Sequence, residues 1–311
     1  MTAPEDKTPP KTAGAGAPVA AKPAAAVSPG GPKDVDTIPP HVEASQALYL
    51  RVMTEQLTGW NDPRAMLERA LRENLFLLLA QKILPLGSGN PDPLCYEVLL
   101  RLKQEEDNLL PPGGFFDVAE SLGMMAKIDR WVVRAVLSWC AARQKRNPEK
   151  PLPMMCVNLS APALRGTSFL GAVREELQNA GVPPRVLCFE LREHDVLEHP
   201  DAAREFVATL KPLGCRFTLD AFGSVKVSFA HLNGLPVDFI KIDGVIIESM
   251  LQGPLGPATV KAINLVCKEV GIRTIAEFVE AKETLAKLRE IGVDYVQGFG
   301  IARPEPISKI P

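Results

Sequence analysis

The sequence has little that would mark a membrane protein, a secreted disulfide protein or a nucleic-acid-binding protein. No apolar run approaches the length of a membrane span, and the N-terminus lacks the charged-then-apolar order of a secretory signal. The six cysteines include no C-x-x-C pair and the four histidines show no ligand spacing, so no zinc site is predicted. The 35 lysines and arginines are balanced by 37 acids, which excludes broad binding to DNA, RNA or membrane surfaces. These absences favour a cytoplasmic protein with reduced cysteines in its core.

The first 40 residues contain almost no large apolar side chains and are rich in alanine, proline, glycine and lysine. Such a segment cannot bury enough surface to offset its ordering entropy, so residues 1–40 are predicted to be a disordered leader. A partner-binding tail is the alternative. Helical spacing begins near Val42, and residues 41–65 are predicted to form an N-terminal helical segment that either packs on the following domain or mediates dimerisation. The sequence does not decide between these two roles.

From residue 66 to 311 short apolar runs alternate with amphipathic helical segments, several of which close on glycine. The apolar runs are LFLLLAQKI, CYEVLLRL, MMCVNLS, VLCFELRE, RFTLDAFG, FIKIDG, TIAEFVE and YVQGFGI. Eight strands separated mostly by helices predict an α/β fold, a TIM-like (β/α)8 barrel. The first connection, LPLGSGNPDPL, is rich in turn formers, so the first two strands are predicted to be antiparallel. A doubly wound open sheet is the alternative, but no glycine-rich phosphate loop follows the first strand.

Each predicted strand from the second onward carries a polar or charged residue where its apolar run ends. These residues are Glu97, Asn158, Glu190, Asp220, Lys241, Glu277 and Gln297. The C-terminal ends of barrel strands meet on one face, where four carboxylates would repel one another without a counter-charge. Mg²⁺ or Mn²⁺, which prefer oxygen ligands, are predicted to supply it. For any single acid taken alone, a helix cap or a solvated loop residue is the alternative.

The strand around Glu97 adds a further candidate. In YEVLLR alternate residues share a face, so Glu97, Leu99 and Arg101 point the same way. Glu97 could therefore bind metal while Arg101 takes a phosphate oxygen. An ordinary surface arginine is the alternative.

From about Met66 to Pro306 the sequence resembles the EAL domain, the cyclic di-GMP phosphodiesterase module of bacterial signalling. The name motif is present as Glu97-Val98-Leu99, a mild variant. The further matches, in order, are VNLS (157–160), FELRE (189–193), LDAFGS (219–224), FIKIDG (239–244), AEFVE (276–280) and VQGFG (296–300). So many motifs in the right order make the resemblance specific, and it implies the EAL type of barrel over residues 66–311.

The resemblance implies a role for each strand-end residue. The ligands of the first metal ion would be Glu97, Asn158, Glu190 and Asp220. Lys241 would contact the attacking water. Glu277 would bind metal or activate that water. Glu193 would brace the loop after the fifth strand. The residues completing the ligand pocket would be Gln297, Arg101 and Gln81. The implied reaction opens one phosphodiester bond of cyclic di-GMP with water and yields linear pGpG.

One position departs from the family pattern. The family normally has two aspartates in succession and the second bridges to a second metal ion, whereas this chain has Asp220 followed by Ala221. A second ion should therefore bind weakly or not at all. The loop that follows is also altered, and its Lys226 could either substitute for the lost cation or remain solvated. Arg192 stands where a threonine is common in the family.

These observations predict a protein that binds cyclic di-GMP while its phosphodiesterase activity is weak or lost. It would then act as a receptor that passes nucleotide occupancy to a protein partner or through a homodimer. Two alternatives stay open at this point. One is a working phosphodiesterase that tolerates Ala221, and the other is a protein-interaction module that no longer binds nucleotide.

Overall fold

The computed structural model describes residues 60–87, 95–103, 109–110, 112–224 and 226–311. The predicted leader (1–40), most of the predicted helical segment (41–65) and the turn of the first predicted hairpin therefore lie outside the described residues.

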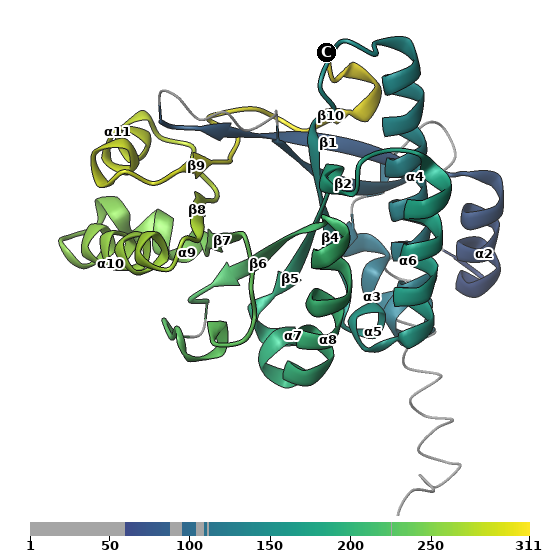
Figure 1. The fold of residues 1–311 in the computed structure, drawn as a ribbon, viewed down its shortest axis with the longest axis horizontal. Helices are drawn as coiled ribbons and strands as arrows, with labels where there is room; N and C mark the ends of the chain where they lie inside the picture. The colour runs from purple at the N-terminus through teal and green to yellow at the C-terminus, as the bar shows by residue number, and fades with distance from the viewer. Residues whose placement is uncertain (1–59, 88–94, 104–108, 111, 225) are drawn as a thin grey trace, which may run out of the picture. The chain divides into compact units, whose positions relative to one another are not determined.

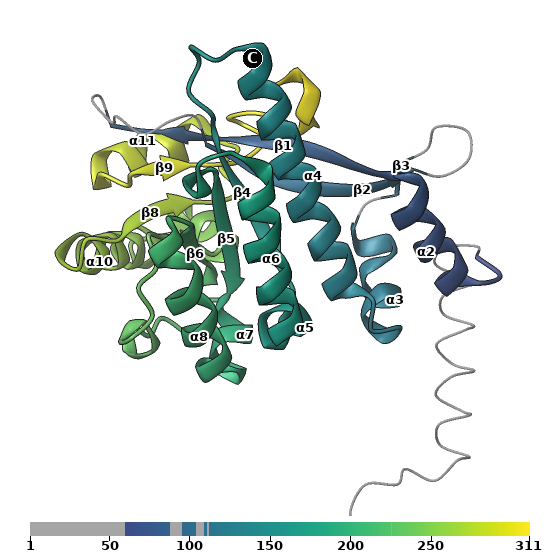
Figure 2. The same cartoon turned by 45° about the vertical axis from the view of Figure 1, so that its right-hand side comes forward.

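The predicted apolar runs form the strands of a closed barrel, which Figure 1 and Figure 2 show from two directions. Its strands are β1 (Phe76–Pro85), β2 (Cys95–Lys103), β4 (Met154–Leu159), β5 (Leu187–Arg192), β6 (Arg216–Phe222), β7 (Phe239–Ile242), β8 (Arg273–Ala276) and β9 (Tyr295–Val296). Two short strands pair antiparallel with members of the barrel: β3 (Leu109–Leu110) with β2, and β10 (Glu305–Pro306) with β1. The neighbours run β1-β9-β8-β7-β6-β5-β4-β2, and the β1–β2 pairing closes the ring. The α/β barrel predicted from the sequence is confirmed.

Strand β1 is the irregular member of the barrel. It runs antiparallel to β2, where Gln81 pairs with Glu97, and antiparallel to β9, where Leu84 pairs with Val296. The pairings from β2 through β4 to β9 are all parallel. The predicted antiparallel first pair is therefore confirmed. Because β2 and β4–β9 run in the same direction, their polar residues are brought to one face of the barrel. The prediction that Glu97 stands at the end of its strand is wrong, since it is the third residue of the nine-residue β2.

Helices cover the outside of the strands (Figures 1 and 2). They are α2 (Pro63–Glu73), α3 (Phe116–Ser121), α4 (Met125–Arg146), α5 (Ala161–Arg165), α6 (Thr167–Ala180), α7 (Glu193–Glu198), α8 (Pro200–Leu210), α9 (Gly244–Glu248), α10 (Leu255–Glu269) and α11 (Lys282–Ile291). Short 3₁₀ turns occur at η2 (Pro112–Gly114), η3 (Pro184–Val186), η4 (Lys211–Leu213), η5 (Ala230–Leu232), η6 (Ser249–Leu251) and η7 (Ile307–Lys309). Within the described residues, none of the helices has the length and apolar character that crossing a membrane would require.

Local sequence signals explain where several helices begin and end. Asp62 caps α2 by accepting a hydrogen bond from the backbone N–H of Ala65, and Pro63 occupies the first helical position. Helices α6 and α11 end at Gly181 and Gly292, both in the left-handed conformation that glycine adopts without strain.

The barrel interior is divided into an apolar layer and a polar layer. The apolar layer consists of Ile83, Cys95, Met154, Cys156, Cys188, Phe239, Ile275 and Tyr295. The polar layer lies two residues further along each strand, as in the step from Cys188 to Glu190 on β5, because alternate strand residues share a face. All six cysteines are buried free thiols, which confirms the prediction of reduced core cysteines.

Candidate functional site

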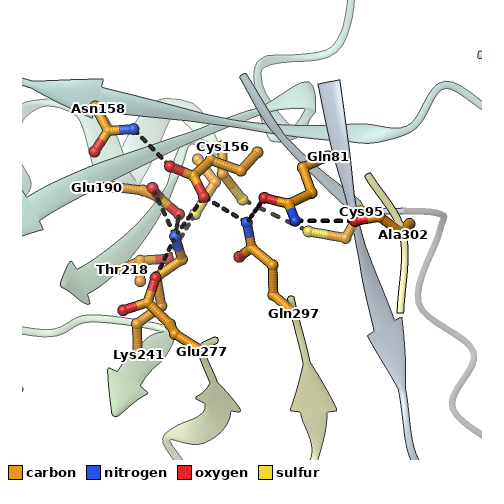
Figure 3. A network of polar contacts seen from close by, with 12 residues as sticks. Gln81, Cys95, Cys156, Asn158, Glu190, Thr218, Lys241, Glu277, Gln297 and Ala302 are labelled. Atoms are coloured by element: carbon orange, nitrogen blue, oxygen red, sulfur yellow. Dashed lines mark hydrogen bonds and ion pairs between the residues drawn. The ribbon is translucent and has the colours of Figure 1, made fainter. Parts of the chain in front are cut away.

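The buried ammonium group of Lys241 is the centre of the polar layer. This side chain extends from β7 and is 1% exposed. Its Nζ lies 3.0 Å from Oε2 of Glu97, 3.0 Å from Oε2 of Glu190 and 3.3 Å from Oε1 of Glu277 (Figure 3). The structure thus brings together side chains from β2, β5 and β7 and from the end of β8, which are far apart in the sequence.

The acids outnumber the ammonium group that they surround. Burial and the neighbouring charges of Glu97 and Asp220 raise the pKa of Glu190 well above its ordinary value, although Lys241 opposes the shift. Burial likewise raises the pKa of Glu277 to about 7. The carboxylates in turn raise the pKa of Lys241, against the effect of burial, so this lysine is charged. Carboxyl groups outnumber basic groups in this cluster, as expected of a site that accepts a further cation.

Glu97 is the carboxylate with the most hydrogen bonds. Burial favours its neutral form, but Lys241 and donated hydrogen bonds outweigh burial and hold the pKa of Glu97 below its ordinary value. The amide of Asn158 donates to Oε1 at 2.8 Å, and the amide of Gln297 donates to Oε2 at 2.6 Å. Glu97 is therefore an ionised carboxylate in a defined orientation.

Gln81 supports this arrangement from β1. Its side-chain oxygen accepts a hydrogen bond from Gln297 Nε2 at 3.1 Å, and its own Nε2 donates to the carbonyl of Ala302 at 3.0 Å (Figure 3). The side chain is buried. Gln81 thus orients Gln297, and its predicted contact with a dinucleotide stays a prediction.

Whether the predicted ligand set fits a divalent cation can be judged from its oxygen atoms. Among the described residues, no group of three or more His, Cys, Asp or Glu side chains could hold a metal ion as placed. The acids instead converge on the ammonium of Lys241. Two buried oxygens, Oδ1 of Asp220 and Oε1 of Gln297, have no hydrogen-bond partner within the described part of the chain. An oxygen-rich donor set with unpartnered acceptors fits a hard cation such as Mg²⁺ or Mn²⁺.

The backbone at two strand ends adopts an unusual conformation. Ala221 and Phe278, which directly follow Asp220 and Glu277, both have positive φ angles, +54° and +52°. The register between β6 and β7 shifts between Leu219 and Phe222, as in a β-bulge. Left-handed backbone is unfavourable for alanine and phenylalanine, and it is better tolerated by aspartate, asparagine or glycine. The conformation at position 221 would therefore suit an aspartate, the residue that the resemblance noted in the sequence leads us to expect there.

Glu193, at the start of α7, accepts a hydrogen bond at one carboxylate oxygen, and its other carboxylate oxygen lies near a histidine without a hydrogen bond between them. Oε2 accepts a hydrogen bond from the backbone N–H of Gly223 at 2.8 Å, and Oε1 lies 3.1 Å from Nε2 of His231. Both side chains are largely buried, with exposures of 4% and 10%. Burial raises the pKa of Glu193 and lowers the pKa of His231. Glu193 therefore ties the loop after β6 to α7.

A cavity of about 420 Å³ opens beside the polar layer, between β2, β4 and α4. Apolar walls come from residues such as Leu99, Phe116 and Ile128, and polar atoms come from Asn158 and other strand-end residues. An apolar cleft with a few convergent polar groups is typical of a small-molecule site.

Asp129, on α4, is a buried acid that lines this cavity. Its Oδ2 accepts hydrogen bonds from the backbone N–H and the hydroxyl of Ser160, at 3.0 and 2.6 Å. Burial nevertheless raises the pKa of Asp129 to about 6. Sequence reasoning missed Asp129, although a lone acid among apolar residues in MAKIDRWVV was a usable signal.

The two predicted cationic residues near the site lie in different places. Arg101 is half-buried on β2, on the same side of the strand as Glu97, and its Nη1 donates to the carbonyl of Leu100 at 2.7 Å. Lys226 is exposed and lines a separate cavity with Glu193 and His194. Lys226 therefore lies in the loop after β6 and does not line the cavity that Asn158 borders.

Comparison with known proteins gives consistent results. Residues 64–304 match the family described as the EAL domain. Cyclic di-GMP phosphodiesterase PdeB of Shewanella oneidensis is 33% identical over 240 residues, which are 77% of this chain and 28% of that protein. Cyclic di-GMP phosphodiesterase PdeF of Escherichia coli is 30% identical over 274 residues, 88% of this chain and 35% of that protein. The chain thus spans about a third of the length of these curated relatives.

Solved structures share the fold. The FimX EAL domain of Pseudomonas aeruginosa bound to c-di-GMP superposes with a TM-score of 0.72 and 31% identity, covering 79% of this chain and 97% of that one. The FimX EAL domain of Xanthomonas citri in complex with c-diGMP has a TM-score of 0.74 and 28% identity, covering 84% of this chain and 99% of that one.

Proposed function

The chain belongs to the EAL domain family, and from this premise we propose that it binds cyclic di-GMP at the C-terminal face of its barrel while its phosphodiesterase activity is weak or lost. We also propose that residues 66–311 form this domain. The observation that carries the proposal is the contrast between Asp220 and Ala221. Asp220 has a buried Oδ1 atom without a hydrogen-bond partner among the described residues, and its charge acts on Glu190, Lys241 and Glu277, whereas the side chain of Ala221 has no ligand atom.

The proposed first metal site consists of Glu97, Asn158, Glu190 and Asp220. When bound there, Mg²⁺ or Mn²⁺ would polarise the phosphate and stabilise the negative charge that develops on its oxygens during hydrolysis. Lys241 adds a fixed buried cation, and Gln297 holds Glu97 in orientation through their 2.6 Å hydrogen bond. Arg101 would donate to a phosphate oxygen.

Hydrolysis needs more than this set of residues. Water would attack phosphorus as the bond to one ribose oxygen breaks, and Glu277 would take the proton of the water, a role suited to a group with a pKa of about 7. In a two-metal mechanism a second cation shares the stabilisation of the nucleophile and the phosphate. Without a carboxylate at position 221 that contribution is reduced, by several kcal/mol or about three orders of magnitude in rate. Binding can therefore persist where turnover fails, as in a receptor for the nucleotide that acts through a protein partner or a homodimer.

An active phosphodiesterase is the second candidate. It is supported by the retention of Lys241 and Glu277, which lie 3.3 Å apart in the polar layer. In that case one cation would suffice for hydrolysis at a useful rate.

Titration calorimetry with cyclic di-GMP, with and without Mg²⁺ or Mn²⁺, tests binding. The expected result is saturable heat that is stronger with metal and is weakened in Glu97→Gln, which removes a charged ligand atom at nearly constant shape. No heat at high nucleotide concentration would exclude both candidates and leave the protein-interaction module. A turnover assay for pGpG then separates the two candidates, because ordinary enzyme rates would exclude the receptor.

A further inference from the structure

Arg192 is a charged residue at the barrel mouth that the proposed site does not yet include. It is the last residue of β5, and its Cα is the register partner of Asp220 on β6. Because alternate strand residues share a face, Arg192 lies on the same side of β5 as Cys188 and Glu190, which face the barrel interior. Arg192 therefore stands one step above Glu190 and directly beside the strand end that carries Ala221.

The guanidinium of Arg192 is available to a ligand. Its side chain is exposed, and across the described ranges no hydrogen bond or ion pair engages it. It is also not required to cap α7, since its side chain makes no capping hydrogen bond. An exposed arginine without a carboxylate partner retains all five N–H donors for an anion.

Arg192 also differs in charge from the other charged residues that line the cavity. It lines the 420 Å³ cavity together with Asn158, and it is the one basic side chain among the described residues of that lining. The acids of the lining are Asp117, Glu120, Asp129 and Asp195. An anionic ligand that enters this cavity next to Asn158 therefore meets a single positive side chain.

We propose that Arg192 contacts the phosphodiester of the bound cyclic dinucleotide where the ligand enters the cavity beside Asn158, and so supplies positive charge that needs no carboxylate ligand at Ala221. The proposal rests on the proposed function. A guanidinium matches the geometry of phosphate oxygens and donates two parallel hydrogen bonds to them. A guanidinium carries its own positive charge, so its contact with a phosphate needs no bound metal ion.

The same chemistry explains why binding and hydrolysis separate. A guanidinium neutralises phosphate charge, but it cannot generate hydroxide as a metal ion does. Arg192 therefore stabilises the bound nucleotide without restoring the lost catalytic step. Lys226, the other basic residue considered for this role, lines the separate cavity beside Glu193.

Calorimetry of cyclic di-GMP binding to three variants tests the proposal. Arg192→Gln is expected to weaken binding at least about tenfold, since a charge-assisted hydrogen bond is removed. Arg192→Lys keeps the charge but not the paired donors, and it is expected to lose less nucleotide affinity than Arg192→Gln. Lys226→Gln is the matched control and is expected to bind within twofold of the wild type. Raising the salt concentration should reduce the difference in nucleotide affinity between the wild type and Arg192→Gln, because salt screens the electrostatic contact.

A second titration, with Mn²⁺ and no nucleotide, separates the proposed role from structural damage. Removing a positive charge near the metal ligands cannot weaken cation binding, so Arg192→Gln should bind Mn²⁺ as tightly as the wild type or more tightly. The proposal is overturned if Arg192→Gln binds the nucleotide as the wild type does, if it loses Mn²⁺ and nucleotide together, or if Arg192→Lys loses as much as Arg192→Gln. Failure of the proposed function is distinguishable, because the wild type itself would then bind no nucleotide.

Discussion

The Nζ atom of Lys241 lies 3.0 Å from Oε2 of Glu190, and both side chains are almost completely buried. Glu190 has no other basic partner at this distance within the described residues. The ionised form of Glu190 therefore depends on Lys241, because an unpaired charge in the barrel interior would be strongly destabilising.

Replacing Lys241 by methionine should reveal this dependence. The variant keeps the length and apolar stem of the side chain but leaves Glu97, Glu190 and Glu277 without their shared cation. The free energy of unfolding, measured with urea at pH 7, should fall by about 3–5 kcal/mol. Added Mn²⁺ should recover part of that loss, since it supplies another positive charge to the same acids. A loss below about 1 kcal/mol, with no effect of Mn²⁺, would show that these acids do not depend on a cation.

Asp129 should make the stability depend on pH. Its pKa is about 6 in the folded protein and 3.8 ordinarily, so between these values the unfolded chain has released a proton that the folded chain retains. The contribution of Asp129 to stability therefore falls as pH rises from about 4 to 6, by roughly 3 kcal/mol. Asp129→Asn keeps an oxygen for Ser160 but cannot ionise. Its stability relative to the wild type should rise over that pH interval, and a difference independent of pH would contradict the prediction.

Glu193→Ala should loosen the loop after β6. The substitution removes the acceptor of the Gly223 N–H and leaves His231 without its carboxylate partner, so the free energy of unfolding should fall by about 1–3 kcal/mol. Hydrogen exchange at the Gly223 amide should become faster, while exchange within β5 stays slow. His194→Ala is the control, since the His194 side chain is 68% exposed. Unchanged protection at Gly223 would show that Glu193 does not hold the loop.

Ala221→Asp should restore a ligand for a second cation. The left-handed backbone at this position, with φ at +54°, suits aspartate better than alanine. With Mn²⁺ present to offset the repulsion between neighbouring carboxylates, the variant should therefore fold at least as stably as the wild type. Mn²⁺ titration in the presence of nucleotide should show an additional bound ion, and pGpG formation should rise by at least tenfold.

Ala221→Gly distinguishes the effect of backbone strain at position 221 from the effect of adding a carboxylate there. Glycine relieves the same strain, which should add up to about 1 kcal/mol of stability, but it offers no ligand and should leave hydrolysis unchanged. If Ala221→Asp gains neither an ion nor activity, residues 225–227, rather than Ala221, would account for the weak or absent hydrolysis that we propose.

The sequence by itself determined the elements of this protein and the layer in which its polar residues lie. Apolar runs such as FIKIDG predict buried strands, and the period of two that every strand obeys places Phe239 and Lys241 on the same face of that strand. The N-cap at Asp62 and the helix ends at Gly181 and Gly292 were equally predictable, because capping is decided by the few residues on either side.

Only the tertiary structure decided which of these side chains meet. The position of Lys241 between three acids depends on the register of separate strands, and the pairing of Glu193 with His231 depends on the path of a loop. Arg192 and Lys226 were both plausible cations in the sequence, yet Arg192 lines the cavity at Asn158 and Lys226 lines another. Strand periodicity specifies the face on which a residue lies, but the partner it contacts is set by long-range pairing and by loop conformation, which local spacing does not encode.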